Sequence, residues 1–171
     1  LGMADILTLK NITKIYGENT KNPTQVLFGI DLNFKESSFN SIIGQSGSGK
    51  STLLNIIGSL DRPSSGEILL SGKDLSVFTN KELANMRNQY LGFIFQFHYL
   101  LPEFTTLENV LMPFRISKNA VTSEVTSRAY ELLELVGLKS FENQLASNLS
   151  GGQQQRVAIA RSLINNPKIV L

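Results

Sequence analysis

Apolar and polar residues alternate near the start of the chain, which predicts a half-buried antiparallel strand over residues 6–12. A second, mostly alternating stretch predicts a strand from Val26 to Phe34. Short apolar runs predict further strands over residues 39–43, 67–70 and 90–95, and Lys168 to Leu171 begins another. In the first strand, one side carries Ile6, Thr8, Lys10 and Ile12, and the other carries Leu7, Leu9 and Asn11.

Helices are predicted where apolar residues recur at helical spacing and where a capping residue precedes them. An apolar helix is expected from Thr52 to Leu60, ended by the turn at residues 61–66. Residues 124–136 form an amphipathic pattern with Gly137 as the C-terminal cap. Three capping boxes open further helices: Thr79 with Glu82, Thr105 with Glu108, and Ser150 with Gln153. The order of elements is that of an α/β protein with a mostly helical insertion between about Gln96 and Leu149.

Composition narrows the possible functions. With 42% hydrophobic and 18% charged residues, the 171-residue chain can bury a core as one compact domain or one with a small insertion. The net charge of +2 is small and not gathered in a basic run, which argues against nucleic acid as a partner. The chain has no cysteine, so disulfides and thiolate metal sites are excluded. No apolar stretch approaches the ~18 residues needed to span a bilayer.

The strongest motif is a glycine-rich loop of the form G-x-x-x-x-G-K-[ST] between a predicted strand and a predicted helix. The amide groups of residues 47–51 can cradle a phosphate at the helix N-terminus. Lys50 can reach the β- and γ-phosphates, and the Ser51 hydroxyl suits Mg²⁺. A glycine-rich turn that binds nothing explains neither the flanking elements nor the Lys-Ser-Thr run. The candidate ATP-binding residues are Gly44, Gln45, Ser46, Gly47, Ser48, Gly49, Lys50, Ser51 and Thr52.

A second segment, residues 149–156, begins another helix with glycines in its first turn. A plain capping box explains Ser150 and Gln153, but each glycine at Gly151 and Gly152 lowers helix stability. These glycines are explained if an anion must approach bare backbone at the helix N-terminus. The phosphate loop alone does not separate kinases, GTPases and ATPases.

With both segments, the chain resembles the ATP-binding subunit of ATP-binding-cassette transporters over essentially its whole length. Residues 149–153 match that family's signature loop. Gln96 matches its glutamine loop, which touches Mg²⁺ and the attacking water, and Tyr16 matches the aromatic residue that stacks on adenine. Taken alone, Tyr16 would be an ordinary surface tyrosine and Gln96 a polar residue at a strand end; their order around the two motifs supports the functional interpretation.

The resemblance implies a RecA-like P-loop NTPase core with an antiparallel β subdomain and an inserted α-helical subdomain. Residues 1–95 would form the β subdomain and the first part of the ATPase core. Residues 96–148 would form the helical subdomain, and residues 149–171 the signature helix and the start of the next core strand. The catalytic residues within the chain would be Lys50 and Gln96, with ATP and Mg²⁺ as cofactors and Ser51 and Gln96 as the Mg²⁺ ligands.

A narrower resemblance, to the bacterial lipoprotein-release and macrolide-export group, rests on residues 95–110. In the family, this segment receives a helix of an integral membrane subunit. The receiving surface would consist of Phe97, Tyr99, Leu101 and Phe104. His98, the sole histidine, is interpreted as an interface or packing residue. The protein would lie peripherally on the cytoplasmic face of the bacterial inner membrane.

One phosphate loop and one signature loop per chain imply a homodimer that forms on ATP binding. In the family, ATP on one loop is capped by Ser150, Gly151, Gly152 and Gln153 of the other chain. Hydrolysis also needs an acidic residue and a glutamate, which in the family follow the strand that begins at Lys168. The switch histidine is absent as well. We therefore expect a truncated piece of a longer protein, which by itself binds nucleotide weakly or not at all and does not hydrolyse ATP.

Other classes remain as alternatives. A non-transport ATPase of the same superfamily would interrupt the region between Gln96 and Ser150 with long coiled coils or zinc modules, and here it holds only ~50 residues without cysteines or sustained heptads. A small-molecule kinase lacks the Ser-Gly-Gly-Gln helix start. A nucleotide-sensing module without catalytic activity is the third alternative, and co-purification with a membrane subunit would favour transport over all of them.

Overall fold

The computed structural model describes residues 4–117 and 120–171, and its contacts divide the chain into two compact units, residues 1–83 and 84–171. Each unit is described by itself. The first contains β1 (Asp5–Tyr16), β2 (Thr24–Lys35), α1 (Lys50–Ile57), β3 (Ser65–Leu70), β4 (Lys73–Asp74), η1 (Leu75–Val77) and the start of α2 (Asn80–Tyr90). The second contains the rest of α2, then β5 (Leu91–Gly92), α3 (Thr106–Ile116), α4 (Ser123–Leu135), η2 (Ala146–Asn148), α5 (Gly151–Leu163) and β6 (Ile169–Val170).

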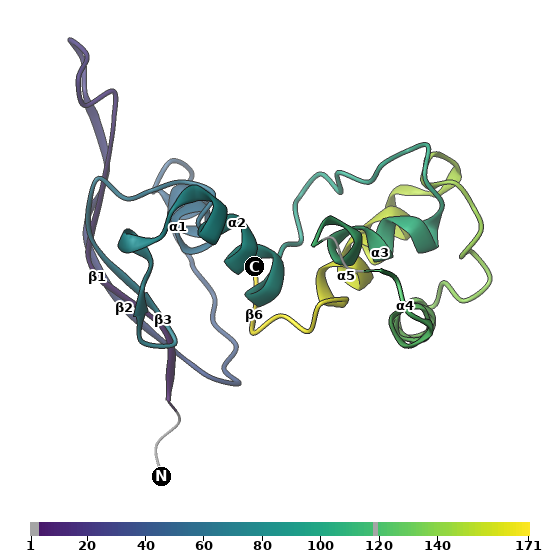
Figure 1. The fold of residues 1–171 in the computed structure, drawn as a ribbon. Coiled ribbons are helices and arrows are strands. Elements are labelled where there is room, and N and C mark those ends of the chain that lie inside the picture. Colours follow the sequence, from purple (N-terminus) through teal and green to yellow (C-terminus); the bar gives the residue numbers. More distant parts are fainter. Residues whose placement is uncertain (1–3, 118–119) are drawn as a thin grey trace. The chain divides into compact units, whose positions relative to one another are not determined.

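The first unit is an antiparallel sheet with strand order β2-β1-β3-β4, and α1 lies beside it (Figure 1). The predicted strands over residues 6–12, 26–34 and 67–70 are confirmed. The first two are longer than predicted because β1 and β2 pair along nearly their full lengths. The buried apolar side chains of α1 are Leu53, Ile56 and Ile57. They belong to the same compact unit as the buried β1 residues Leu9 and Ile12.

A bulge in β1 changes the predicted alternation. The register passes from Leu9 opposite Leu32 to Ile12 opposite Ile30, so β1 has one more residue than β2 over this stretch. Asn11 takes a positive φ of 47° there. As a result Ile12 is completely buried, as Leu7 and Leu9 nearly are, instead of lying on the opposite side. The strand prediction was right, but its division into two sides was wrong beyond Lys10.

The predicted strand at residues 39–43, immediately before the phosphate loop, does not form. A strand requires a neighbouring strand for its main-chain hydrogen bonds, and no strand of the part of the chain that the structure describes pairs with this segment. Its large apolar side chains are consequently exposed, Phe39 to 96% and Ile43 to 93%. These residues are apolar strand formers, but an apolar run does not determine whether a neighbouring strand is available to pair with it.

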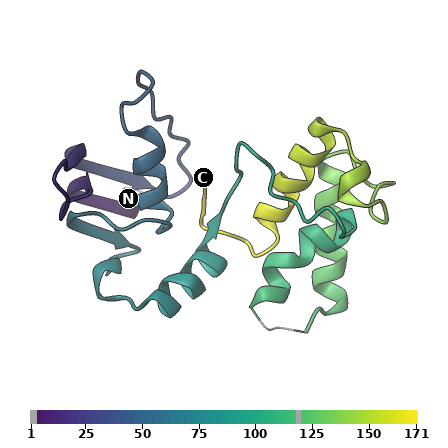
Figure 2. The same ribbon diagram turned by 90° about the horizontal axis from the view of Figure 1, so that it is seen from above.

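The second unit packs α3, α4 and α5 around one apolar core (Figure 2). Val110 of α3, Leu133 of α4 and Val157 of α5 are completely buried there. The capping boxes predicted at Thr105 and Ser150 are confirmed, with both reciprocal hydrogen bonds present in each. The amphipathic helix is also confirmed, as α4. It ends through Gly137, which has a φ of +71° and follows the cap residue Val136.

The predicted strand over residues 90–95 is much shorter in the structure. Tyr90 is the last residue of α2, and β5 contains only Leu91 and Gly92, paired in parallel with β6. The main-chain N–H of Ile94 also donates to the carbonyl of Leu171 at 2.8 Å, so the pairing continues beyond the assigned strand. The capping box predicted at Thr79 is confirmed, with the Glu82 carboxylate accepting from Thr79 and the Glu82 N–H donating back. Across residues 4–117 and 120–171, no helix is long and apolar enough to cross a membrane.

Candidate nucleotide-binding site

The phosphate loop leaves the unpaired segment at residues 39–43 and ends where α1 begins at Lys50. The Lys50 ammonium lies back against its own loop, donating to the carbonyl oxygens of Gly44 at 2.9 Å and Gln45 at 2.6 Å. It also lies 3.3 Å from the Ser48 hydroxyl. These contacts place the positive charge of Lys50 against the loop that precedes α1.

Gly49, the residue before α1, could not be replaced without strain. Its φ is +88°, in the left-handed region where glycine carries no steric penalty. A Cβ there would also lie 2.9 Å from the Leu27 side chain and 3.2 Å from the main-chain oxygen of Val26. The glycine therefore lets the loop pack directly against β2, which fixes the start of α1. Ser51, one position into the helix from Lys50, is exposed, and Thr52 is half-buried.

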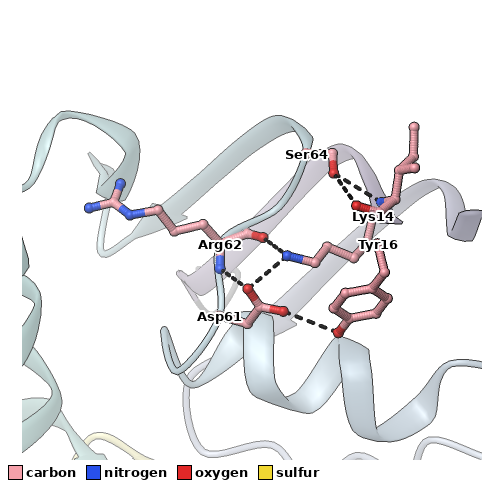
Figure 3. Close-up of polar contacts among 6 residues, drawn as sticks. Lys14, Tyr16, Asp61, Arg62 and Ser64 are labelled. Atoms are coloured by element: carbon pink, nitrogen blue, oxygen red, sulfur yellow. Dashed lines mark hydrogen bonds and ion pairs between the residues drawn. The ribbon is translucent and has the colours of Figure 1, made fainter. Parts of the chain in front are cut away.

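Tyr16 is the last residue of β1 and belongs to the same unit as the loop. It is 42% exposed. Its hydroxyl donates to Asp61 Oδ2 at 3.1 Å, and the Lys14 ammonium lies 4.9 Å from the centre of its ring (Figure 3). Burial of Asp61 raises its pKa, but hydrogen bonds from Lys14, the Arg62 main chain and Tyr16 outweigh this and hold the pKa of Asp61 below its ordinary value of 3.8.

In the second unit, Ser150 caps α5 through the N–H of Gln153, and the Gln153 side chain accepts from the N–H of Ser150 at 2.8 Å. Ser150, Gly151 and Gly152 are exposed. A Cβ built on either glycine would meet no atom within 4 Å. Packing within the chain therefore gives no reason for glycine at these two positions. The main chain at Gly151 and Gly152 is therefore open to close approach by a ligand or another molecule.

Gln96 is exposed and follows β5 by a few residues in the same unit. The residues after it include Phe97 and Tyr99, which are exposed to 67% and 66%. Leu101 is exposed as well, whereas Phe104 is half-buried. Three of the four side chains predicted to form a receiving surface thus stand in solvent.

This exposed segment is held by two side chains that the sequence analysis did not single out. The Arg161 guanidinium donates to the carbonyls of His98 at 2.7 Å and Tyr99 at 2.8 Å. The amide of Asn109 is fully buried; it accepts from the Leu101 N–H at 2.8 Å and donates to the Leu101 carbonyl at 3.0 Å. The position of Asn109 in the first turn of a helix opened by a capping box was only a weak indication that its side chain is buried. No sequence pattern indicated that Arg161 contacts residues 98 and 99.

The structure places the candidate residues in two groups. Tyr16 and the phosphate loop lie in the first unit, and Gln96 and the segment from Ser150 to Gln153 lie in the second. Lys14 and Asp61, which contact Tyr16, were also missed by the sequence analysis. They are 47 residues apart, so no local pattern joins them.

Together, a lysine-centred phosphate loop on an α/β unit and a glycine-led helix define a nucleotide-binding protein of the P-loop class. The family model of the ABC transporter matches residues 27–171. The chain therefore belongs to the ABC transporter family. At the level of that family, its function is that of a transporter's ATP-binding subunit.

Individual relatives agree with this family. The lipoprotein-releasing system ATP-binding protein LolD 1 of Rhodopseudomonas palustris is 48% identical over 169 residues, which cover 99% of this chain and 75% of that protein. A dimeric structure of MJ0796, described as a bacterial ABC transporter cassette, is 44% identical with a TM-score of 0.86, over 96% of this chain and 72% of that one. A second dimeric MJ0796 structure, described as a post-hydrolysis state bound to ADP and Pi, matches equally well.

A further structure, cbiO1 of Clostridium perfringens, is described as part of the ABC transporter complex cbiONQ. It is 28% identical with a TM-score of 0.82, over 97% of this chain and 64% of that one. These matches confirm the predicted fold class, a P-loop NTPase cassette with an antiparallel sheet and a helical part.

Proposed function

We propose that, in the full-length protein, residues 44–52 bind ATP, and that ATP binding and hydrolysis drive lipoprotein release or substrate export by a partner membrane subunit. The observation that carries the proposal is the Lys50 ammonium, which lies against the loop and donates to the carbonyl oxygens of Gly44 and Gln45. Phosphate oxygens are stronger acceptors for an ammonium group than neutral carbonyls are. The relative LolD 1 is the ATP-binding protein of a lipoprotein-releasing system, which supports lipoprotein release as the process that ATP drives.

Mg²⁺ fits this site as an ion shared with the nucleotide. Among the residues that the structure describes, no cluster of three or more acidic or histidine side chains could hold a metal alone. Mg²⁺ is commonly held by one or two protein oxygens together with substrate phosphates. The exposed Ser51 hydroxyl and the Gln96 side chain are the residues that would hold it. The ion would neutralise charge on the β- and γ-phosphates, while Lys50 and the loop amides orient them.

The homodimer that we propose joins two chains head to tail, with ATP bound on one chain and capped by Ser150, Gly151 and Gly152 of the other. The open space around both glycines supports this, because it permits a phosphate to reach the N-terminus of α5. Dimeric structures of the relative MJ0796 support it further. We also propose that the 171-residue chain alone does not turn ATP over, since hydrolysis needs further acidic groups; measurable turnover by the purified chain would contradict this.

Residues 97, 99 and 101 are proposed to receive the integral membrane subunit at the cytoplasmic face of the bacterial inner membrane. Their exposure gives an apolar contact surface, and the hydrogen bonds from Arg161 and Asn109 hold its backbone. A surface held in one conformation loses less entropy on binding than a mobile loop does.

The substitution Ser150→Arg tests the dimer in the full-length protein. A large cation at the start of α5 should leave ATP binding to the phosphate loop unchanged and prevent closure. We therefore expect a Kd for ATP within about twofold of wild type, a small free-energy change, with loss of the ATP-induced dimer on size exclusion and loss of turnover. The matched control is Ser147→Arg, at an exposed position before the helix. A normal ATP-induced dimer in Ser150→Arg would overturn the proposed arrangement.

A further inference from the structure

A compact polar cluster ties the end of β1 to the turn that follows α1 (Figure 3). The Lys14 ammonium donates to Asp61 Oδ1 and to the carbonyl of Arg62, both at 2.7 Å. The Tyr16 hydroxyl donates to the other Asp61 oxygen, Oδ2, at 3.1 Å. Each oxygen of one carboxylate thus holds a different side chain of β1.

The main chain strengthens this connection. The Ile15 N–H donates to the Ser64 hydroxyl at 2.9 Å, and the Ser64 N–H donates to the Thr13 carbonyl at 2.9 Å. Asp61 is in turn anchored to α1, since its N–H donates to the Asn55 carbonyl at 3.2 Å. The ion pair is partly shielded from water, with the Lys14 side chain only 12% exposed and the Asp61 side chain 32% exposed. An ion pair of this kind holds its geometry better than one in open solvent.

The cluster also restricts the Tyr16 ring. Lys14 and Tyr16 are two residues apart on a strand, so their side chains share a face. The Lys14 ammonium, 4.9 Å from the ring centre, is attracted to the aromatic electrons and occupies part of the ring surface. A planar ligand can therefore stack only on the ring surface that Lys14 leaves free.

We propose that Lys14 and Asp61 are positioning residues, which set the orientation of the Tyr16 ring relative to α1 and the phosphate loop at its start. This inference rests on the proposed ATP site and on the expectation, from the family resemblance, that the Tyr16 ring stacks on adenine. Because α1 begins at Lys50 and Asp61 is bonded to the same helix, the cluster fixes the ring with respect to the phosphate site. A ring fixed in advance costs less entropy when a base stacks on it.

The experiment compares the Kd of ATP with the Kd of inorganic triphosphate, which has no base, by calorimetry on the full-length protein. Asp61→Ala removes the acceptor of the Tyr16 hydroxyl and one of the two acceptors of Lys14. It should weaken ATP binding about fivefold, as expected for hydrogen bonds of ordinary strength. Inorganic triphosphate should bind as it does to wild type. Asp61→Asn retains an oxygen for the Tyr16 hydroxyl and should recover part of the affinity for ATP. In a Tyr16→Ala background, Asp61→Ala should produce no further loss.

The matched control is Lys10→Gln, which removes a lysine of the same strand from its ion pair with Glu67 at 2.8 Å and should change neither Kd. Equal weakening of ATP and triphosphate in both Asp61 variants would mean that Asp61 serves only the fold, and would overturn the inference. Unchanged ATP affinity in Asp61→Ala or in Tyr16→Ala would also overturn it. If wild type bound neither ligand, the proposed function itself would fail. If wild type bound both ligands but the Asp61 and Tyr16 variants bound ATP as wild type does, the inference would fail and the proposed function would stand.

Discussion

Among single residues, Lys50 and Asp61 show two different uses of a charged side chain. The Lys50 ammonium is satisfied by the carbonyls of Gly44 and Gln45, which a phosphate can replace without breaking any element of the fold. Asp61 accepts from Lys14 and Tyr16 and so belongs to the fold itself. The sequence motif predicted the first of these residues, and only the structure revealed the second.

Replacing Lys50 should abolish tight ATP binding. Lys50→Ala removes the mobile positive charge, and charge-assisted hydrogen bonds of about 1.5–3 kcal/mol each are lost. We expect the Kd of ATP to rise at least about 100-fold, measured by calorimetry. The control is Lys73→Ala, an exposed lysine of β4 in the same unit. An ATP affinity close to wild type in Lys50→Ala would remove this lysine from the site.

The contribution of Asp61 to stability should depend on pH. Its folded-state pKa lies below the ordinary value of 3.8, so the unfolded chain takes up its proton first as the pH falls. The stabilisation is therefore complete above about pH 5, and it is lost as the pH drops through 3.8 towards the folded-state pKa. Urea unfolding of wild type and Asp61→Asn should differ by about 1 kcal/mol at pH 7, and this difference should shrink as the pH falls below 3.8. A difference that does not change over this range would contradict the assignment.

Among the elements, the helix starts are determined by local sequence, whereas the segments between helices depend on tertiary contacts. The boxes at Thr105 and Ser150 are complete within four consecutive residues, so each helix start follows from its own sequence. Residues 97–104 have no regular structure of their own. They are held by Asn109 of α3 and Arg161 of α5, which reach them through tertiary packing.

Loss of the Arg161 contacts should loosen this segment without unfolding α5. Arg161→Met keeps an apolar stem and removes both hydrogen bonds to the carbonyls of His98 and Tyr99. Amide hydrogen exchange at residues 98–101 should accelerate about tenfold. The matched control is Arg128→Met, because Arg128 donates in the same manner to the carbonyls of Leu163 and Ile164. It should accelerate exchange only near the end of α5. Unchanged protection at 98–101 in Arg161→Met would contradict this role.

At the scale of the whole molecule, the two units contain different parts of the predicted site. The first contributes the phosphate loop and Tyr16, and the second contributes Gln96 and the start of α5. The apolar segment at residues 39–43 pairs with no strand of residues 4–117 and 120–171, and Phe39 and Ile43 are almost entirely exposed. Exposed apolar strand formers with free backbone groups promote association between chains.

The 171-residue chain should therefore self-associate in a concentration-dependent manner. The double substitution Phe39→Ser with Ile43→Ser removes the two most exposed apolar side chains of this segment and should shift the sedimentation profile towards monomer. The control is Ile116→Ser, which removes an exposed apolar side chain of α3 in the second unit. A wild-type chain that remains monomeric at high micromolar concentration would contradict the prediction.

The amino-acid sequence by itself determined those features whose interactions close within a few residues. These are the glycine-rich loop before α1, the capping boxes, the Gly137 helix end and the apolar faces of the helices. The bulge at Asn11, the absence of a strand at residues 39–43 and the hydrogen bonds of Asp61 and Arg161 follow instead from contacts between distant parts of the chain. Such features depend on which distant backbone or side chain comes within hydrogen-bond distance, and neither periodicity nor capping residues encode that partner.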